Sequence, residues 1–186
     1  MTLTRGHILL SGMILGLSLN AMAQEISSQQ PAEHIDYWSV WADAKGVTHQ
    51  THCRINDMTF ESYAPPAAPE WVSHGDPQAK RLLFNVAPVG WVGSWHHNPA
   101  TQWVIPLEGH WFTETTDGVR RKYGPGELML GNDQAARSIN GHDGHLSGTA
   151  GKTPVRLMIM QLDERTLKQP NTACPAGGKA IDNTGP

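Results

Sequence analysis

The sequence predicts an all-β fold, and two observations carry this prediction. After residue 24, no segment repeats its apolar residues at the 3.6-residue spacing of an amphipathic helix. Short runs of strand-forming residues recur instead, and turn residues separate them, with 19 glycines and 13 prolines in the chain of 186 residues. Many short strands with frequent turns are typical of a β-sandwich or a β-barrel. The length is enough for one domain of medium size.

Turn residues separate the expected strands, and one separating stretch is rich in proline. Residues 64–71 contain Pro65, Pro66 and Pro69 and predict a stiff connection or an edge segment. In chain order the expected strands are residues 37–41, 48–55, 59–63, 81–86, 102–107, 111–115, 119–123, 127–130, 145–147 and 155–162.

Two turns in the middle of the chain have clear sequence signals. Asp117-Gly118 lies between two expected strands and predicts a type I′ hairpin turn, in which both central residues have a positive φ. Gly124-Pro125-Gly126 predicts the next turn. These residues therefore predict a run of antiparallel strands between residues 111 and 130.

The last expected strand, residues 155–162, differs from the others because it has almost no polar alternation. Such a strand is typically covered on both faces. One cover would be the interior of the barrel or sandwich, and the other a second layer or a second subunit. We therefore include a homodimer among the expected partners.

Composition and charge exclude two classes of protein. Apolar residues make up 39% of the chain, which is too many for a disordered protein. Lysine and arginine number 14 against 17 aspartates and glutamates, so the formal charge is −3. A chain without an excess of basic residues lacks the electrostatic footprint of a DNA- or RNA-binding protein. We expect no nucleic-acid partner.

The first 23 residues have the layout of a secretory signal peptide. Arg5 is a short basic region, residues 7–19 are mostly apolar, and residues 21–23 (Ala-Met-Ala) form a cleavage site. A membrane anchor is the alternative, but the apolar run is short for a membrane span. We expect a periplasmic or secreted protein that has no contact with the membrane after cleavage.

The chain has two cysteines, Cys53 and Cys174. Export would place them in an oxidising compartment, where a single disulfide between them is the natural hypothesis. That bond would attach the C-terminal tail to the body of the protein. Two free thiols are the alternative.

Histidines gather in two places in the second half of the chain. His96, His97 and His110 lie in the tryptophan-rich segment 90–111, and His142 and His145 follow in a glycine-rich segment. Imidazoles on neighbouring strands can hold a transition metal together with an oxygen ligand. Adjacent strand residues point to opposite faces, so only one of His96 and His97 is expected to point inward.

Other residues of this region have simpler expected roles. Trp91, Trp95, Trp103 and Trp111 are either core anchors or part of a barrel mouth where a flat ligand or a sugar stacks. If Gln102 points inward, the alternation of a strand turns Trp103 outward. The carboxylates Glu114, Glu127, Asp133 and Asp143 are expected in turns or at the surface.

The segment 90–109 resembles the first signature motif of the cupin superfamily, G-x5-H-x-H-x3-4-E-x6-G. Gly90, His96 and Gly109 match that motif, whereas Asn98 stands at the second histidine and Gln102 at the glutamate. Further pieces follow in the order seen in small bacterial cupin-domain proteins. They are W-H-x-x-P-x-x-Q at 95–102, Asp117-Gly118, Pro125-Gly126-Glu127, and G-H-x-S at 144–147.

The resemblance covers about residues 85–163 and implies a single jelly-roll β-barrel that is often dimeric. Residues 24–84 would then be N-terminal strands and a proline-rich connection that pack on this core, and residues 164–186 a flexible tail. Cupins usually hold one divalent metal inside the barrel. Carried over by position, the ligands would be His96, Gln102 and His145, with His97 and His142 as alternatives to the two histidines.

The resemblance also implies a function. The expected cofactor is one divalent transition metal (Zn, Cu, Fe, Mn or Ni), and the expected partner is a small organic substrate that the metal helps to oxygenate, isomerise or cleave. Because Asn98 and Gln102 replace the usual ligands, the alternative is a metal-free cupin that binds a small molecule or a sugar.

Overall fold

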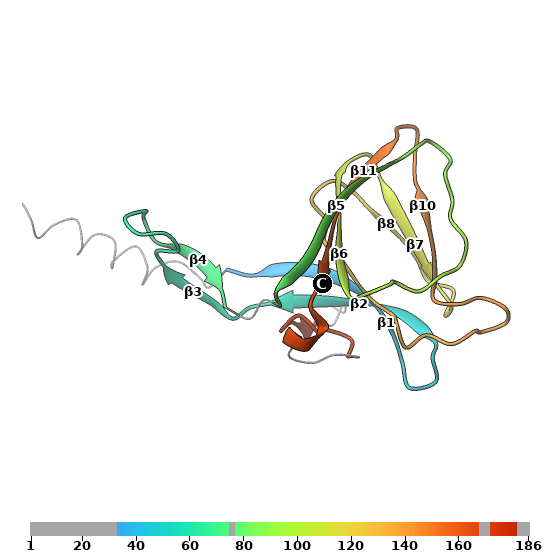
Figure 1. Cartoon of the computed structure of the whole chain (residues 1–186), viewed down its shortest axis with the longest axis horizontal. Helices are drawn as coiled ribbons and strands as arrows, with labels where there is room; N and C mark the ends of the chain where they lie inside the picture. Colours follow the sequence, from blue (N-terminus) through green and yellow to red (C-terminus); the bar gives the residue numbers. More distant parts are fainter. Residues whose placement is uncertain (1–32, 75–76, 168–171, 182–186) are drawn as a thin grey trace, which may run out of the picture.

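The computed structural model describes residues 33–74, 77–167 and 172–181, and the predicted signal peptide 1–23 lies outside them. These residues form an all-β protein with two main sheets and a separate hairpin (Figure 1). The strands are β1 (Ile35–Ala42), β2 (Thr48–Ile55), β3 (Met58–Glu61), β4 (Glu70–Ser73), β5 (Ala79–Ala87), β6 (Gln102–Glu108), β7 (Trp111–Thr115), β8 (Arg120–Tyr123), β9 (Met129–Asn132), β10 (His145–Thr149), β11 (Val155–Leu162) and β12 (Lys179–Ala180). One short 3₁₀ helix, η1 (Glu164–Thr166), follows β11.

The larger sheet has seven strands in the order β12-β2-β1-β9-β6-β11-β5. It is mixed, because β1 runs parallel to β9 while its other pairs are antiparallel. The smaller sheet has the order β10-β7-β8, and β3 pairs with β4 in a hairpin that projects away from the two sheets (Figure 1). The hydrogen-bonded strands of the described residues do not close into one barrel.

All ten expected strands are present, and their boundaries differ by a few residues at most. The sequence did not predict β4 or β12. β4 begins directly after Pro69, in a stretch whose prolines favour a connection. β12 has two residues, too few for a periodic pattern.

The predicted type I′ turn at Asp117-Gly118 is wrong in its detail. Gly118 has a φ of 86°, but Asp117 is not among the described residues with a positive φ. The amide of Gly118 donates to the carbonyl of Thr115, and the amide of Thr115 donates to that of Val119. The hairpin therefore turns through residues 115–118. Gly118, the last residue of this turn, has the left-handed backbone conformation.

Each face of the seven-stranded sheet is covered by its own apolar core. On the inner face, Val40, Val104 and Leu157 pack against Trp111 and Tyr123 of the three-stranded sheet. On the outer face, the C-terminal segment covers a second buried cluster, whose members are Tyr37, Cys53, Ile55, Leu130, Leu162, Leu167, Cys174 and Ala176. Trp103 packs edge-on against Tyr37 of this outer cluster, on the face opposite Gln102, as the alternation of β6 predicts.

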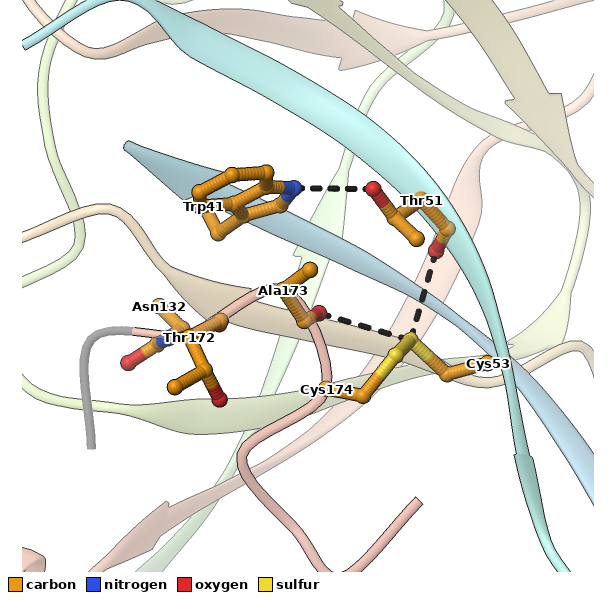
Figure 2. The surroundings of a disulfide bond; sticks show 7 residues. All are labelled: Trp41, Thr51, Cys53, Asn132, Thr172, Ala173 and Cys174. Carbon is orange, nitrogen blue, oxygen red and sulfur yellow. Dashed lines mark hydrogen bonds between the residues drawn. A yellow bond between two sulfur atoms is a disulfide. The ribbon is translucent and has the colours of Figure 1, made fainter. Parts of the chain in front are cut away.

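The predicted disulfide between Cys53 and Cys174 is confirmed, and the alternative of two free thiols is wrong (Figure 2). It joins residues 121 positions apart and fixes the C-terminal segment to β2. Beside it, the side-chain amide of Asn132 donates to the carbonyl of Thr172 at 3.1 Å. The bond is consistent with an oxidising compartment outside the cytoplasm.

Strand β11, which the sequence predicts to be covered on both faces, is buried at some residues and only half-buried at others. Leu157 and Leu162 are buried, whereas Met158 and Met160 are half-buried. The neighbouring edge strand β5 exposes Leu82, Phe84 and Val86, and the homodimer remains a prediction. No helix among the described residues is long and apolar enough to cross a membrane.

Candidate functional site

A cavity of about 140 Å³ lies against the inner face of the large sheet. Three residues predicted as metal ligands, His96, Gln102 and His145, all line it. They come from the segment before β6, from β6 itself and from β10. The full lining is Asn85, Trp91, His96, Asn98, Gln102, Val104, Trp111, Met129, His145, Ser147, Leu157 and Ile159.

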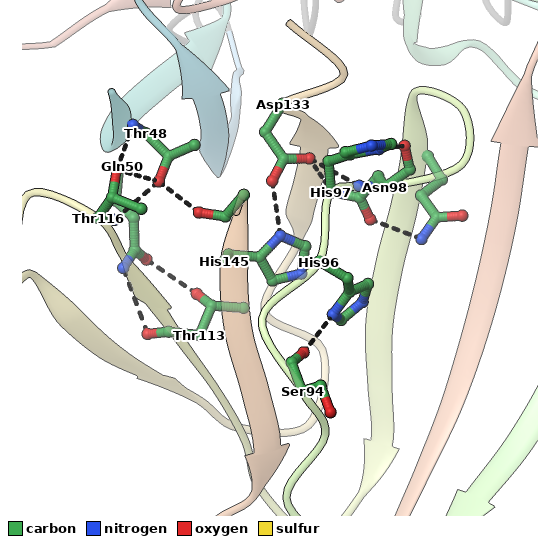
Figure 3. Close-up of polar contacts among 12 residues, drawn as sticks. Thr48, Gln50, Ser94, His96, His97, Asn98, Thr113, Thr116, Asp133 and His145 are labelled. Carbon is green, nitrogen blue, oxygen red and sulfur yellow. Dashed lines mark hydrogen bonds and ion pairs between the residues drawn. The ribbon is translucent and has the colours of Figure 1, made fainter. Parts of the chain in front are cut away.

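His145 begins β10 and is buried, with 3% of its surface exposed. Its Nδ1 lies 2.6 Å from Oδ2 of Asp133, a carboxylate that is fully buried in the segment after β9 (Figure 3). Burial alone would raise the pKa of Asp133. The hydrogen bond with His145 and two hydrogen bonds from Asn98 act against burial and lower that pKa below its ordinary value.

The state of Asp133 decides the tautomer of His145. An ionised carboxylate can only accept a hydrogen bond, so Nδ1 of His145 carries the proton. In the neutral imidazole, Nε2 then keeps a free lone pair. This is the arrangement in which a second group orients a metal-binding histidine.

His96 also carries its proton on Nδ1, but its hydrogen-bond partner is a backbone carbonyl. Its Nδ1 lies 2.8 Å from the carbonyl oxygen of Ser94, which is an acceptor, so Nδ1 donates. In the neutral ring Nε2 then keeps its lone pair, and it has no hydrogen-bond partner among the described residues. The rings of His96 and His145 have their centroids 4.7 Å apart (Figure 3). His96 is exposed to solvent, whereas His145 is buried. The pair therefore lines the cavity from its solvent-exposed edge to its buried part.

Backbone contacts hold the two histidines side by side. The amide of each donates to the carbonyl of the other, at 3.0 and 2.8 Å. Gly144 makes this approach feasible, because a Cβ atom there would overlap the carbonyl of His96, and its φ of 72° also favours glycine. The hydroxyl of the buried Thr48 donates to the carbonyl of Gly144 at 2.6 Å (Figure 3). Strand β2 therefore helps to position the residue before His145.

Gln102 belongs to a chain of hydrogen bonds that ends at Asp133. Oδ1 of Asp133 accepts from the backbone and side-chain amides of Asn98, at 2.9 and 2.7 Å. Oδ1 of Asn98 accepts from Gln102 at 2.8 Å, and Gln102 in turn accepts from Gln161 at 3.2 Å. Gly131 leaves the space for Asn98, because a Cβ atom at that position would overlap the Asn98 side chain. Both amides therefore support the carboxylate that orients His145.

The other two candidate histidines do not line the cavity. His97 is exposed, and Figure 3 shows its ring apart from those of His96 and His145. His142 is exposed and stacks on Trp95, with ring centroids 4.2 Å apart. The site thus contains one histidine from each of the two sequence clusters.

Asp133 is the residue of the site that the sequence did not predict. The expectation of a turn or surface carboxylate is wrong for it, because it is fully buried between His145 and Asn98. Its one local signal is its position directly after β9, whose four residues are all buried. Its partners lie 12 and 35 positions away in the chain, and no local pattern connects them.

The side chains of the cavity supply some, but not all, of the ligands that a transition metal usually has in a protein. Two neutral imidazoles are suitable ligands for Zn, Cu, Fe and Ni. The described residues include no group of three or more His, Cys, Asp or Glu side chains arranged to hold a metal. The amide of Gln102 is the remaining candidate donor, and it is engaged with Asn98 and Gln161. A metal held here would keep positions open for water or substrate.

Comparisons with known proteins identify no family. No family model and no curated protein matches the sequence. Among solved structures, the protein NMB1881 from Neisseria meningitidis is similar over 50% of this chain and 88% of its own, with 13% identity and a TM-score of 0.31.

Proposed function

We propose that this chain is an exported protein of the cupin type, with a jelly-roll core, and that it binds one divalent transition metal between His96 and His145. Its function would be the conversion of a small organic molecule at that metal. One observation carries the proposal: both imidazoles line one cavity and use Nδ1 for a hydrogen bond, and neither Nε2 has a hydrogen-bond partner among the described residues. The ordered cupin motifs support it further.

The chain's own residues would share the work of such a site. His145 and His96 would hold the metal, Asp133 would fix the ring of His145, and Asn98 with Gln102 would hold Asp133 in place. A bound metal supplies Lewis acidity, or a point where substrate and dioxygen meet. The exposed position of His96 gives small molecules access to the pair.

The second candidate is a metal-free binding module for a small molecule or a sugar. It is favoured by the amides of Asn98 and Gln102, which stand at two ligand positions of the cupin motif and are engaged in hydrogen bonds. In this function the cavity and its tryptophans would bind a ligand without chemistry.

Metal content separates the two functions. Protein purified from the periplasm without a metal-affinity column should contain about one equivalent of a single transition metal by mass spectrometry. His96→Ala and His145→Ala should each lose it, because each removes one of the two imidazoles. The matched controls His97→Ala and His142→Ala change histidines outside the cavity and should keep it.

Two results would contradict the metal site. One is protein without metal that takes up none when Zn, Cu, Fe, Mn or Ni is added. The other is equal loss of metal in the control variants. The first result, together with a ligand that changes tryptophan fluorescence, would support the binding module.

A further inference from the structure

The lining of the cavity has a distinctive balance of chemistry. Half of its members are apolar or aromatic, namely Trp91, Val104, Trp111, Met129, Leu157 and Ile159. The other half are neutral amides, imidazoles and a hydroxyl. No lysine, arginine, aspartate or glutamate is among these described lining residues, and Asp133 behind them is already bonded to His145 and Asn98.

The side chains of this lining do not favour strongly charged ligands. A buried phosphate or ammonium group without an opposite charge loses its hydration and gains nothing in return. The basic side chains Arg120 and Lys122 line a different hollow, beside Phe112 and Thr149. A phosphorylated sugar or a nucleotide therefore finds no charged side chain to pair with in the lining of the histidine cavity, and only a bound metal would offer it an opposite charge.

Two tryptophans give the cavity a flat wall. The rings of Trp91 and Trp111 stack, with centroids 5.7 Å apart and an angle of 17° between their planes. Trp111 is buried, whereas 41% of Trp91 is exposed, so Trp91 presents surface at the edge of the cavity. Its backbone is fixed, because its carbonyl accepts from the amide of Thr149 at 2.8 Å. Planar rings pack well against such a surface.

The size of the cavity sets an upper limit on the ligand. Its volume is about 140 Å³, whereas pockets for drug-sized ligands measure about 300–1,000 Å³. A ligand of a single ring fits this limit better than a fused or linked ring system.

We infer that the ligand of this site is an uncharged, planar, single-ring molecule with an oxygen donor. The ring would pack on Trp91, and the oxygen would face His96 and His145. The inference rests on the proposed function, because it assigns the substrate class of that same cavity. It also chooses between the two ligands expected at the tryptophans, a flat molecule and a sugar, in favour of the flat molecule.

Four probes test each part of the inference on the full chain by ligand-observed NMR without added metal, so that phenyl phosphate can meet only the side chains of the cavity. Phenol has the inferred features, cyclohexanol has the same size without planarity, phenyl phosphate adds charge, and glucose represents the sugar. Phenol should bind most tightly, cyclohexanol about three- to tenfold more weakly, and phenyl phosphate and glucose more weakly still.

Variants locate the binding. Trp91→Ala should weaken phenol binding about three- to tenfold, which is the size expected for loss of one aromatic contact. Trp91→Phe keeps a flat ring and should retain most of the binding. Trp71→Ala is the matched control, because it removes a tryptophan of the β3–β4 hairpin, and it should bind phenol as the unaltered protein does.

The inference is overturned if no probe binds, if cyclohexanol, phenyl phosphate or glucose binds as tightly as phenol, or if Trp91→Ala binds phenol unchanged. Metal uptake without selective phenol binding would overturn the inference and leave the proposed metal site standing. Phenol binding that depends on Trp91, in protein that takes up no metal, would support the ligand class and contradict the metal site.

Discussion

The two faces of the seven-stranded sheet share the same strands but are held together in different ways. On the outer face, apolar side chains pack beneath the C-terminal segment, and the Cys53–Cys174 bond ties that segment to β2. On the inner face, an apolar cluster lies beside a cavity around which buried polar side chains bond to one another, and Asp133 and His145 are among these buried side chains.

The difference between the two faces suggests that the outer face mainly stabilises the fold, whereas the inner face also binds the proposed metal. A cavity and buried polar groups both reduce the stability that a face can contribute. Continuous apolar packing and a covalent cross-link increase it. We therefore expect changes on the outer face to alter the free energy of unfolding, and changes on the inner face to alter metal binding as well.

The largest effect should come from removal of the disulfide. The double variant Cys53→Ala/Cys174→Ala should lose about 2–5 kcal/mol of unfolding free energy, because the bond closes a loop of 121 residues. Urea unfolding measures this loss. At a temperature where the variant is still folded, its metal affinity should equal that of the unaltered protein. A folded variant that no longer binds metal would contradict the separation of the two faces.

Asp133→Asn tests the inner face. It replaces the charged partner of His145 and should lower the unfolding free energy by about 1–3 kcal/mol. Metal affinity should fall about 10- to 100-fold, as is usual when the group that orients a ligand is lost. Calorimetric titration with Zn²⁺ measures the affinity. Asp57→Asn makes the same change at an exposed position and should alter neither quantity. Unchanged affinity in Asp133→Asn would remove Asp133 from the site.

Gly131→Ala tests the support of that carboxylate without a change of charge. The added methyl group would overlap Asn98, and such overpacking costs about 1–3 kcal/mol. Displacement of Asn98 should also reduce metal affinity, by less than Asp133→Asn does, because Asp133 itself remains. Gly124→Ala is the matched control, since a Cβ atom there meets only ordinary contacts. Equal metal affinities in the two alanine variants would show that Asn98 does not support the site.

The smallest effect concerns a surface pair outside both buried clusters. Arg54 bonds to both carboxylate oxygens of Asp36, at 2.6 and 2.8 Å, and this lowers the pKa of Asp36 below its ordinary value of 3.8. A lowered pKa means that the pair stabilises the fold above about pH 4, and that the contribution is lost as the pH falls through the folded-state pKa.

The variant Asp36→Asn measures that contribution. Both partners are about one-third exposed, so solvent screening limits the contribution to about 0.2–1 kcal/mol. The difference in unfolding free energy between Asp36→Asn and the unaltered protein should be present at pH 5 and shrink as the pH falls below 4. A difference that grows as the pH falls from 4 to 2 would contradict the sign.

Local patterns in the sequence predicted most of the fold and part of the site. Strand periodicity predicted ten strands, and two cysteines in a chain that we expected to be exported predicted a disulfide between them. The cupin-like motif selected His96, Gln102 and His145, and all three line one cavity in the structure. Asp133 could not be found this way, because its burial depends on contacts with residues far along the chain. The turn at Asp117 was wrong in type because the pairing of β7 with β8 sets its geometry.

The central claim is that His96 and His145 both present an unprotonated Nε2 to the cavity. Two-bond ¹H–¹⁵N NMR on histidine-labelled protein at pH 8 tests it directly. Assignment follows from His96→Ala and His145→Ala. The account predicts that both rings carry the proton on Nδ1 and that both Nε2 signals shift together when one equivalent of Zn²⁺ is added. A proton on Nε2 of either ring, or Nε2 chemical shifts that do not change when Zn²⁺ is added, would contradict it.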